Sequence, residues 1–475
     1  MTKNLLTIRI FTEDGLYRLD VDQTLSCIDF KRKVEERCNL SSKQVLCIFL
    51  DSKYEKELPC TSNVSIEKYV TNGQTLYTRL IGNDNSELPD DNNLKESESS
   101  ELSKVQVTQN PEDSVKESTS KPHFVSFDHY LSCSGYNTLD LPLSRVFKPQ
   151  PLVRGTATTI PTSATLKHQS YRCVDHIEFR NVQEMNQFVN YWGREHNMEE
   201  QRAGFLYGFF IDDPHYPMGI RVVVEAIYEP PQVDKNGEIF LLEDPQKHVV
   251  DRIANALQIE CVGFIFTHLP REDLFSPEDL IRAARFQLDY LKDAPKHYTG
   301  YPVAPFVSVT ISPDMENNSF QTNAFIISDL GLALVRDNLI TTMENSTRLL
   351  IKPAPPNMLL PQILEGGKIV TTIDPHWFVV RVNDSAPKQL KSMFSSWSFS
   401  VENRNDPYNP PDVIAHLSKP TTTPNEIYAD FHFILYISTL FDEETAKLIC
   451  KAVVTQKPLD PSVEETFRVL KASVY

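Results

Sequence analysis

The sequence has no apolar run long enough to cross a membrane. The longest late apolar stretch, 431–440, is interrupted by polar residues and falls far short of the roughly 20 residues that span a bilayer. Residues 1–15 alternate apolar and polar side chains and carry early acids, whereas a signal peptide has a continuous apolar core. We therefore expect neither membrane insertion nor secretion, and a core helix at 431–440.

Paired cysteine motifs and a nucleotide-binding phosphate loop are also absent. The eight cysteines show no C-x-x-C pair and no regular spacing, which predicts reduced, intracellular thiols. No G-x-x-x-x-G-K-[ST] occurs, so we do not expect ATP binding through a P-loop. The cysteines are Cys27, Cys38, Cys47, Cys60, Cys133, Cys173, Cys261 and Cys450.

Positive charge is in short supply. Lys and Arg number 47 against 64 Asp and Glu, which gives a formal charge of −17 over 475 residues. By bulk charge, nucleic acids and anionic membranes are poor partners. Hydrophobic residues make up 40% of the chain, enough for sizeable cores, and the length suggests about three domains.

Residues 1–82 have the pattern of a small α+β domain. Alternating apolar residues over 6–21, around an acidic turn, predict a hairpin, and apolar residues four apart predict a helix over 29–39. Strand patterns follow at 45–50 and 75–81. This order predicts a ubiquitin-like β-grasp, although many α+β domains share it.

The next two segments carry little periodicity. Residues 83–122 lack aromatics and are rich in polar and acidic side chains, which predicts a flexible acidic linker, either a tether that raises local concentration or a simple spacer. Residues 123–170 begin with a docking-type segment at 123–131 and then become rich in Pro, Ser and Thr. We expect an irregular docking region there.

Dense secondary structure returns at residue 171. We interpret 171–340 as an α/β domain and 341–475 as a separate C-terminal α+β domain, so the overall class is α+β multidomain. Expected strands cover 172–179, 204–208, 220–228, 261–266, 368–373 and 377–382, and expected helices cover 184–195, 245–257 and stretches near Asp430, Glu443 and Ser462.

The strongest catalytic pattern directly follows the 261–266 strand. Phe266, His268, Ser276 and Asp279 nearly spell H-x-H-x7-S-x2-D, the signature of JAMM zinc peptidases. In that signature two His and one Asp hold zinc, and an upstream Glu activates water. Here Phe266 stands where the first His belongs, and Gln201 stands where the base belongs. An amide cannot take a proton from water at neutral pH, so the pattern is degenerate.

Two other interpretations of these residue types remain open. Ser276 to Asp279 also suits an N-cap, Pro at N1 and first-turn acids of a helix through Tyr290, and His268 suits a hydrogen-bonded strand end. A further metal set would combine His129-x3-Cys133 with Cys173-x2-His176, at unusual spacing.

Several segments together resemble the nuclear protein localisation protein 4 family. The most specific is the Glu-Ala-Ile-Tyr-Glu-Pro-Pro-Gln run at 225–232. Others lie at 171–179, 204–208, 219–221, 241–245, 263–267, 333–337, 399–404 and 430–432, so the resemblance covers most of the chain.

The resemblance implies a ubiquitin-like domain at 1–82 that docks on a hexameric valosin-containing-protein-type AAA ATPase. It also implies a catalytically dead MPN domain at 171–340 which, with the C-terminal domain, binds an ubiquitin-fusion-degradation partner protein and polyubiquitin. Family members carry cysteine-rich zinc modules ahead of the MPN domain, whereas 123–170 contains only Cys133. We therefore expect the zinc modules to be lost.

The resulting hypothesis is a non-enzymatic adaptor without cofactors that recruits polyubiquitinated substrates to the unfoldase for proteasomal and endoplasmic-reticulum-associated degradation. We expect it in the cytoplasm and nucleus, and at the endoplasmic reticulum through partners. The rivals are a JAMM-type deubiquitinase using His268, Asp279 and a distant third ligand, and a scaffold that binds its partner but not the ATPase. The ubiquitin-contacting residues are not identifiable from the sequence.

Overall fold

The protein is described from a computed structural model, within which two compact units form, one from most of 5–82 and one chiefly from 124–473. The predicted linker at 83–122 lies outside the described residues. The structure describes 5–12, 15–37, 44–51, 54, 56–60, 64–82, 124–152, 160–271, 273, 275–315, 319–343, 346–384, 387, 391–404, 410–419 and 424–473.

The first unit is a four-stranded sheet packed on one helix. Its strand order is β2-β1-β4-β3, and the central pair β1–β4 is parallel. Phe30 and Val34, expected on the inner face of the helix, are fully buried. The elements are β1 (Leu5–Thr12), β2 (Gly15–Asp22), α1 (Cys27–Arg37), β3 (Gln44–Phe49), η1 (Ile66–Lys68) and β4 (Thr75–Gly82).

The second unit begins with a region of short elements. One helix, α2, forms within it and includes part of the predicted docking segment at 123–131. The other elements described in this region are two or three residues long. The elements are β5 (Val125–Ser126), α2 (Phe127–Ser134), η2 (Pro142–Ser144), β6 (Gln150–Pro151) and β7 (Ala164–Thr165).

A closed seven-stranded barrel forms the centre of this unit, in the order β10-β11-β9-β23-β16-β15-β14. The predicted boundary at 340 does not separate this barrel from the later residues, because β23 comes from the 341–475 segment and pairs with β16 and β9. Val380 and Val382 of β23 are buried in the barrel core. The strands are β8 (Tyr171–Arg172), outside the barrel, and β9 (His176–Phe179), β10 (Ala203–Asp213), β11 (Gly219–Tyr228), β14 (Glu260–Thr267), β15 (Val307–Asp314), β16 (Ser319–Ile327) and β23 (Val379–Asp384).

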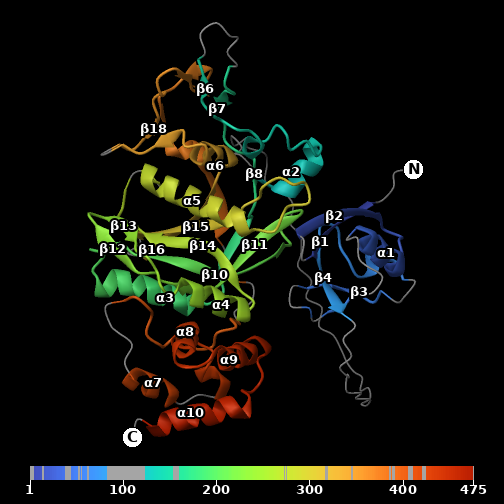
Figure 1. The fold of residues 1–475 in the computed structure, drawn as a ribbon, viewed down its shortest axis with the longest axis vertical. Coiled ribbons are helices and arrows are strands. Elements are labelled where there is room, and N and C mark those ends of the chain that lie inside the picture. Colours follow the sequence, from blue (N-terminus) through green and yellow to red (C-terminus); the bar gives the residue numbers. More distant parts are fainter. Residues whose placement is uncertain are drawn as a thin grey trace, which may run out of the picture. The chain divides into compact units, whose positions relative to one another are not determined.

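Helices cover the barrel on two sides. Helices α5 and α6 lie on one side, and α3 and α4 lie on the other (Figure 1). They are α3 (Val182–Asn190) with a π-helical turn η3 (Tyr191–Glu195), α4 (Lys247–Ala256), α5 (Pro277–Asp293) and α6 (Asp329–Arg336). The smaller elements are β12 (Gln232–Lys235), β13 (Glu238–Leu241), β17 (Ile340–Thr341), β18 (Leu349–Ile351), β19 (Met358–Leu359), β20 (Ile363–Glu365), β21 (Lys368–Ile369), β22 (Thr372–Ile373) and η4 (Pro375–Phe378).

The C-terminal helices pack beneath α4 and share a second apolar core with it (Figure 1). The three expected helices are present, and a fourth, α7, was not expected because its apolar stretch is short and starts with two prolines. The elements are α7 (Pro410–Leu417), η5 (Pro424–Ile427), α8 (Phe431–Leu440), α9 (Glu443–Thr455) and α10 (Pro461–Ser473).

Two further observations concern the cysteines and the helices of the described residues. Seven of the eight cysteines lie among the described residues and are free thiols. Among the described helices, none has the length and apolar character that a bilayer span requires.

Candidate functional site at the end of strand β14

The barrel brings the predicted site residues together at one end. Strand β14 runs beside β10, with Phe266 opposite Ala203, so Gln201 lies next to the end of β14. The side-chain oxygen of Gln201 accepts a hydrogen bond from the Thr267 hydroxyl at 3.1 Å. His268 follows directly, and α5 begins after a short loop. The sequence spacing therefore identifies a real neighbourhood in the fold.

Gln201 is fully engaged in local hydrogen bonds. It is 3% exposed, and its side-chain Nε2 donates to the Met198 carbonyl at 3.2 Å. Its backbone N–H donates to Asp234 Oδ2 at 2.6 Å. The side-chain amide of Gln201 thus ties the Met198 carbonyl to the end of β14.

Phe266 belongs to the hydrophobic core. Its side chain is 3% exposed and packs in the same cluster as Phe275 and Phe325. The Arg282 guanidinium lies 5.8 Å from its ring centroid, a cation–π contact. An aromatic ring of the core thus stands where the predicted pattern would need its first His.

His268 is a strand-end histidine with one free ring nitrogen. Nδ1 lies 2.8 Å from the Leu269 carbonyl and donates to it, while Nε2 has no partner. The side chain is 9% exposed. Burial, followed by the nearby Arg271 charge, lowers the pKa of His268, which favours the neutral ring with a lone pair on Nε2.

Ser276 and Asp279 form a capping box at the start of α5. The Ser276 hydroxyl accepts from the Asp279 N–H at 3.1 Å, and Asp279 Oδ2 accepts from the Ser276 N–H at 3.3 Å. Pro277 occupies the first helical position. The alternative interpretation, that these residues start a helix, is confirmed.

The Asp279 carboxylate is also paired with two cations. Arg271 lies 2.6 Å from Oδ2, and Arg282 lies 3.3 Å from Oδ1. Zinc would need this carboxylate as a ligand, but two guanidinium groups already balance its charge. As the structure places them, Ser276 and Asp279 cap α5, and Asp279 pairs with Arg271 and Arg282.

The second metal set is not assembled. His129 and Cys133 are 3.7 Å apart on α2, whereas Cys173 is buried in the main core and His176 pairs with Asp213 through Nδ1. Throughout the ranges that the structure describes, no three His, Cys, Asp or Glu side chains are grouped to hold one ion.

A buried charge cluster between the barrel and the C-terminal segments was not predicted. Glu229, 1% exposed, accepts from Arg202 and Arg404, and Glu225 accepts from the Ser392 hydroxyl at 2.6 Å. The sequence did carry one sign of this cluster, because Glu225 lies in, and Glu229 directly after, an otherwise apolar strand segment. Acids that are buried in such a segment need buried partners for their charge.

The cluster continues through a buried histidine. His432 lies between Glu184, at 2.7 Å from Nε2, and Glu402, at 2.8 Å from Nδ1. Burial opposes the charged ring, but the two glutamates outweigh it and hold the pKa of His432 well above its usual value. These contacts join α3 to the 399–404 segment and α8.

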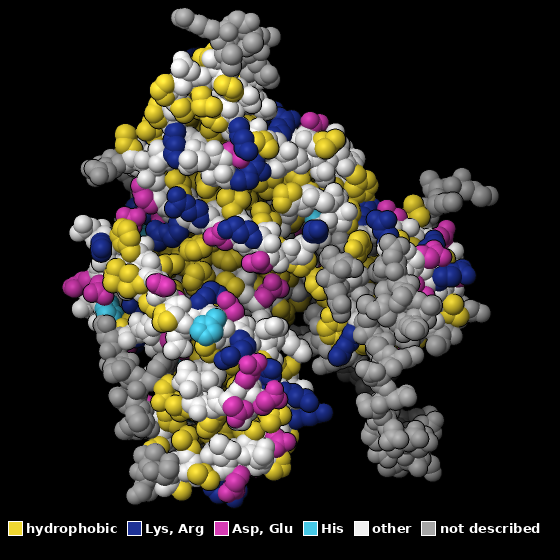
Figure 2. Space-filling view, viewed as in Figure 1, with side chains coloured by type: hydrophobic (Ala, Val, Ile, Leu, Met, Phe, Trp, Pro, Cys, Tyr) yellow, Lys and Arg dark blue, Asp and Glu magenta, His cyan; other side chains and the backbone are white. Residues whose placement is uncertain are grey.

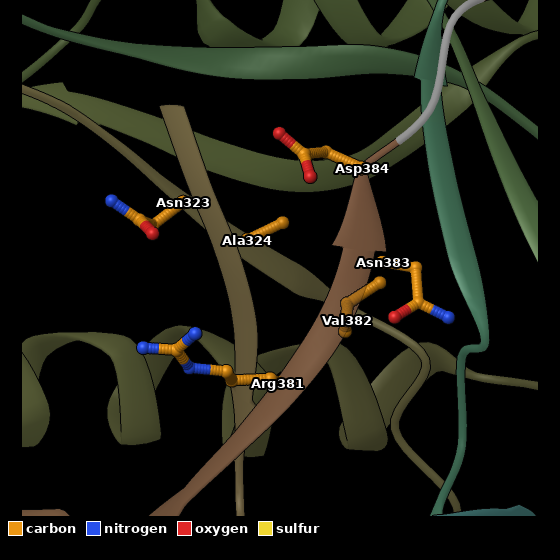
Figure 3. Close-up of a pocket in the computed structure, with 6 residues that line it drawn as sticks. All are labelled: Asn323, Ala324, Arg381, Val382, Asn383 and Asp384. Carbon is orange, nitrogen blue, oxygen red and sulfur yellow. The ribbon is translucent and has the colours of Figure 1, made fainter. Parts of the chain in front are cut away.

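Three further features lie at the surface. A small polar pocket of about 190 Å³ lies on β16 and β23, where Asn323, Arg381 and Asp384 are among the lining side chains (Figure 3). The β12–β13 hairpin carries Val233 and Phe240 directly opposite one another, 36% and 41% exposed. On the visible face, Lys and Arg side chains gather around α5 and α6 (Figure 2).

The fold defines a mixed α+β protein in which a small sheet-and-helix unit is followed by a barrel bearing C-terminal helices. Residues 202–465, more than half of the chain, match the family described as the NPL4 family. The chain belongs to the NPL4 family. Residues 5–79 match a region described as nuclear pore localisation protein NPL4, and residues 142–196 match the putative zinc binding region of the family.

Individual relatives are similar to somewhat less than two thirds of this chain. The human nuclear protein localization protein 4 homolog is 29% identical over 332 residues, covering 62% of this chain and 54% of the relative. The Candida albicans nuclear protein localization protein 4 is 29% identical over 349 residues, covering 66% of this chain and 57% of the relative. The matched part thus spans little more than half the length of these curated relatives.

Proposed function

We propose that this chain is a non-enzymatic adaptor that recruits polyubiquitinated substrates to a hexameric AAA unfoldase, together with an ubiquitin-fusion-degradation partner protein. Its substrates would enter proteasomal and endoplasmic-reticulum-associated degradation. We propose that it works in the cytoplasm and nucleus and reaches the endoplasmic reticulum through partners. The observation that carries this proposal is the NPL4 family match over 202–465.

The first unit supports the docking part of the proposal. Its strand order, parallel central pair and single helix suit the ubiquitin-like β-grasp that we propose for it. It has a core of its own, formed by residues such as Ile8, Phe30 and Leu76. A separately folded unit on a tether can find a binding surface while the second unit holds another ligand.

The β14 site supports binding without chemistry. The Gln201 amide cannot serve as a general base, and Phe266 supplies no metal ligand. Arg271 and Arg282 pair with the one carboxylate of the pattern. We propose that the second unit is a degenerate MPN domain that keeps the barrel and uses its surface for contacts.

Ubiquitin binding is tested with the full chain and polyubiquitin of several lengths and linkages. Saturable binding to at least one chain type supports the adaptor, and no binding to any chain contradicts it. The deubiquitinase rival is tested in parallel by incubation with ubiquitin chains and zinc. Cleavage that a chelator abolishes would establish the rival, and we expect none.

ATPase docking is tested by size-exclusion chromatography with the AAA hexamer. We expect co-elution of the full chain and loss of co-elution when 1–82 is deleted. A matched control lacking 90–115 keeps both units and should still co-elute. If the full chain does not co-elute, the partner-binding scaffold without ATPase docking becomes the better function.

A further inference from the structure

The match of 142–196 to a putative zinc-binding region implies a metal, and the side chains present decide whether one fits. A structural zinc site takes four ligands, most often Cys and His. The matched residues contain one cysteine, Cys173, and three histidines, His168, His176 and His196. Residues 153–159, outside the described ranges, add no Cys, His, Asp or Glu.

The cysteine and one histidine are committed elsewhere. Cys173 is 5% exposed within the main core, where burial raises the pKa of its thiol well above the usual value. Zinc binds the thiolate, which this position disfavours. The Nδ1 atom of His176 pairs with Asp213, whose side chain is fully buried.

The other two histidines lie apart from these. The His168 ring stacks on Trp377 with centroids 4.4 Å apart, and His196 Nδ1 lies 3.6 Å from Glu200. No three ligand-type side chains meet anywhere in the described parts of this region. The residues of the matched region therefore do not fit a zinc site.

An arginine–aspartate pair at the end of α6 holds the start of this region. Arg336 Nη1 donates to the Leu143 carbonyl at 2.9 Å, and Nη2 donates to the Arg145 carbonyl at 2.5 Å. Asp337 Oδ2 accepts from the Phe147 N–H at 2.7 Å. The two side chains bind each other through two hydrogen bonds, each 2.9 Å long. Three hydrogen bonds thus link the Arg336–Asp337 pair to three backbone groups, and two more join the two side chains to each other.

Apolar anchors complete the attachment. Leu141, Leu143 and Phe147 are 8%, 5% and 2% exposed and belong to the barrel core. The Leu143 N–H donates to the Tyr301 hydroxyl at 3.1 Å. Although burial opposes it, the bonds from Arg336 and Phe147 lower the pKa of Asp337, so the aspartate stays ionised at neutral pH.

We propose that the Arg336–Asp337 pair, in place of a metal ion, fixes segment 141–147 on the barrel. A zinc ion organises a loop by drawing side chains to one point, whereas this fork grips the backbone directly through carbonyls and an N–H. Any partner contact made by the segment is then independent of metal. The proposal concerns only this attachment and does not depend on ubiquitin or ATPase binding.

Hydrogen exchange on the full chain tests the proposal at the Leu143 and Phe147 amides. A zinc chelator should leave both exchange rates unchanged. Arg336→Met should raise both by about tenfold or more, because the local opening is no longer opposed by the fork. Arg348→Met is the matched control: Arg348 is 43% exposed and bonds the Thr372 hydroxyl on a different small sheet, so the two amides should stay protected.

A second variant, Asp337→Asn, and a zinc analysis test the same attachment independently of Arg336→Met. Asp337→Asn should raise exchange at Phe147 even where Arg336→Met fails to fold, because the amide side chain cannot bind Arg336 as an ion pair. The purified chain should carry less than one zinc per ten molecules after dialysis, on the order of adventitious binding. Stoichiometric zinc whose removal raises exchange at Leu143 and Phe147 would overturn the proposal. Unchanged protection in both folded variants would overturn it equally.

Discussion

Glu229 and Arg404 lie 175 positions apart in the sequence, and their side chains meet at 2.5 Å in a buried ion pair. Arg202 binds the other oxygen of Glu229 at 2.6 Å. Burial opposes ionisation, but the two arginines outweigh it and lower the pKa of Glu229. The pair connects the end of β11 with the segment that leads to the C-terminal helices.

Arg404→Met is expected to destabilise the second unit by about 3 kcal/mol, because it leaves the buried Glu229 with one cation instead of two. Urea unfolding followed by circular dichroism measures the loss. The matched control is Arg252→Met, since Arg252 and Glu443 are 40% and 50% exposed and 3.6 Å apart. That exposed pair should contribute less than about 1 kcal/mol. Equal effects of the two variants would contradict the buried-pair account.

His432→Gln is expected to cost about 3 kcal/mol, because Glu184 and Glu402 lose the cation between them. The folded pKa of His432 lies above the unfolded value near 6.5. At pH values between the unfolded and the folded pKa, the folded protein therefore binds one more proton than the unfolded protein. The wild-type advantage over the variant is therefore complete below pH 6.5. It should fall by about 1.4 kcal/mol per pH unit above it.

Unfolding free energies of both proteins from pH 6 to 9 provide the measurement. His196→Gln is the control, because His196 faces Glu200 at 3.6 Å with the glutamate 59% exposed. A wild-type-minus-variant difference that stays flat across this range would show that His432 is neutral when folded.

Asp329→Asn is expected to change the pH dependence in the acid range. Burial raises the pKa of Asp329 to about 6, although the Tyr171 and Tyr301 hydroxyls donate to it at 2.6 and 2.7 Å. The folded state therefore binds more protons than the unfolded state between pH 4 and 6, and wild-type stability decreases as pH rises through that window.

The decrease should total about 3 kcal/mol and level off above pH 6, for a shift of about two pKa units. The Asn variant keeps an acceptor for the two hydroxyls and should lack this decrease. Thermal unfolding from pH 4 to 7 compares them. If the stability of the variant depended on pH as that of the wild type does, Asp329 would not be protonated in the folded protein between pH 4 and 6.

Features that depend on residues close together in the sequence could be predicted, whereas features that depend on residues far apart in the sequence could not. Phe30 and Val34, four apart, predicted one buried helical face correctly, because the helical period is local. The Ser276–Asp279 cap could also be predicted from the sequence, because its two residues are only three positions apart. Strand β23 was assigned to the wrong side of a boundary because strand partners are chosen by long-range packing.

The candidate site shows the same limit. The spacing from Phe266 to Asp279 correctly indicated one neighbourhood, but Arg271 and Arg282 had no part in the pattern. The contacts of Glu229 with Arg404 and of Glu184 with His432 needed the fold, because nothing local in either segment specifies the other. Only the presence of acids in an apolar strand hinted that partners existed.

Ser276→Ala is expected to cost about 1 kcal/mol of stability, the usual value of an N-cap, because the Asp279 N–H loses its acceptor. Chemical denaturation measures it. Thr466→Ala is the control: its hydroxyl only bonds back to the Ser462 carbonyl within α10, and it should change stability by less than about 0.5 kcal/mol. If Ser276→Ala lowered the stability no more than Thr466→Ala does, the proposed stabilisation by the Ser276 cap would be contradicted.

Restoring a zinc ligand is expected to require two changes at the β14 site. Phe266→His adds the missing imidazole beside His268, but Asp279 remains bound to Arg271 at 2.6 Å. We expect the single variant to bind zinc weakly. Combining it with Arg271→Ala removes the cation from Asp279 Oδ2, which keeps only the Ser276 N–H as a donor, and completes the two-His, one-carboxylate set that open zinc sites use.

Isothermal titration with zinc compares the single and double variants after circular dichroism has established that both are folded. Phe275→His with Arg271→Ala is the matched control, since Phe275 is a buried neighbour outside the ligand pattern. Equal zinc affinity of the single and double variants would show that Arg271 does not compete for Asp279. Even the zinc-loaded double variant should not cleave ubiquitin chains, because Gln201 still supplies no base for the attacking water.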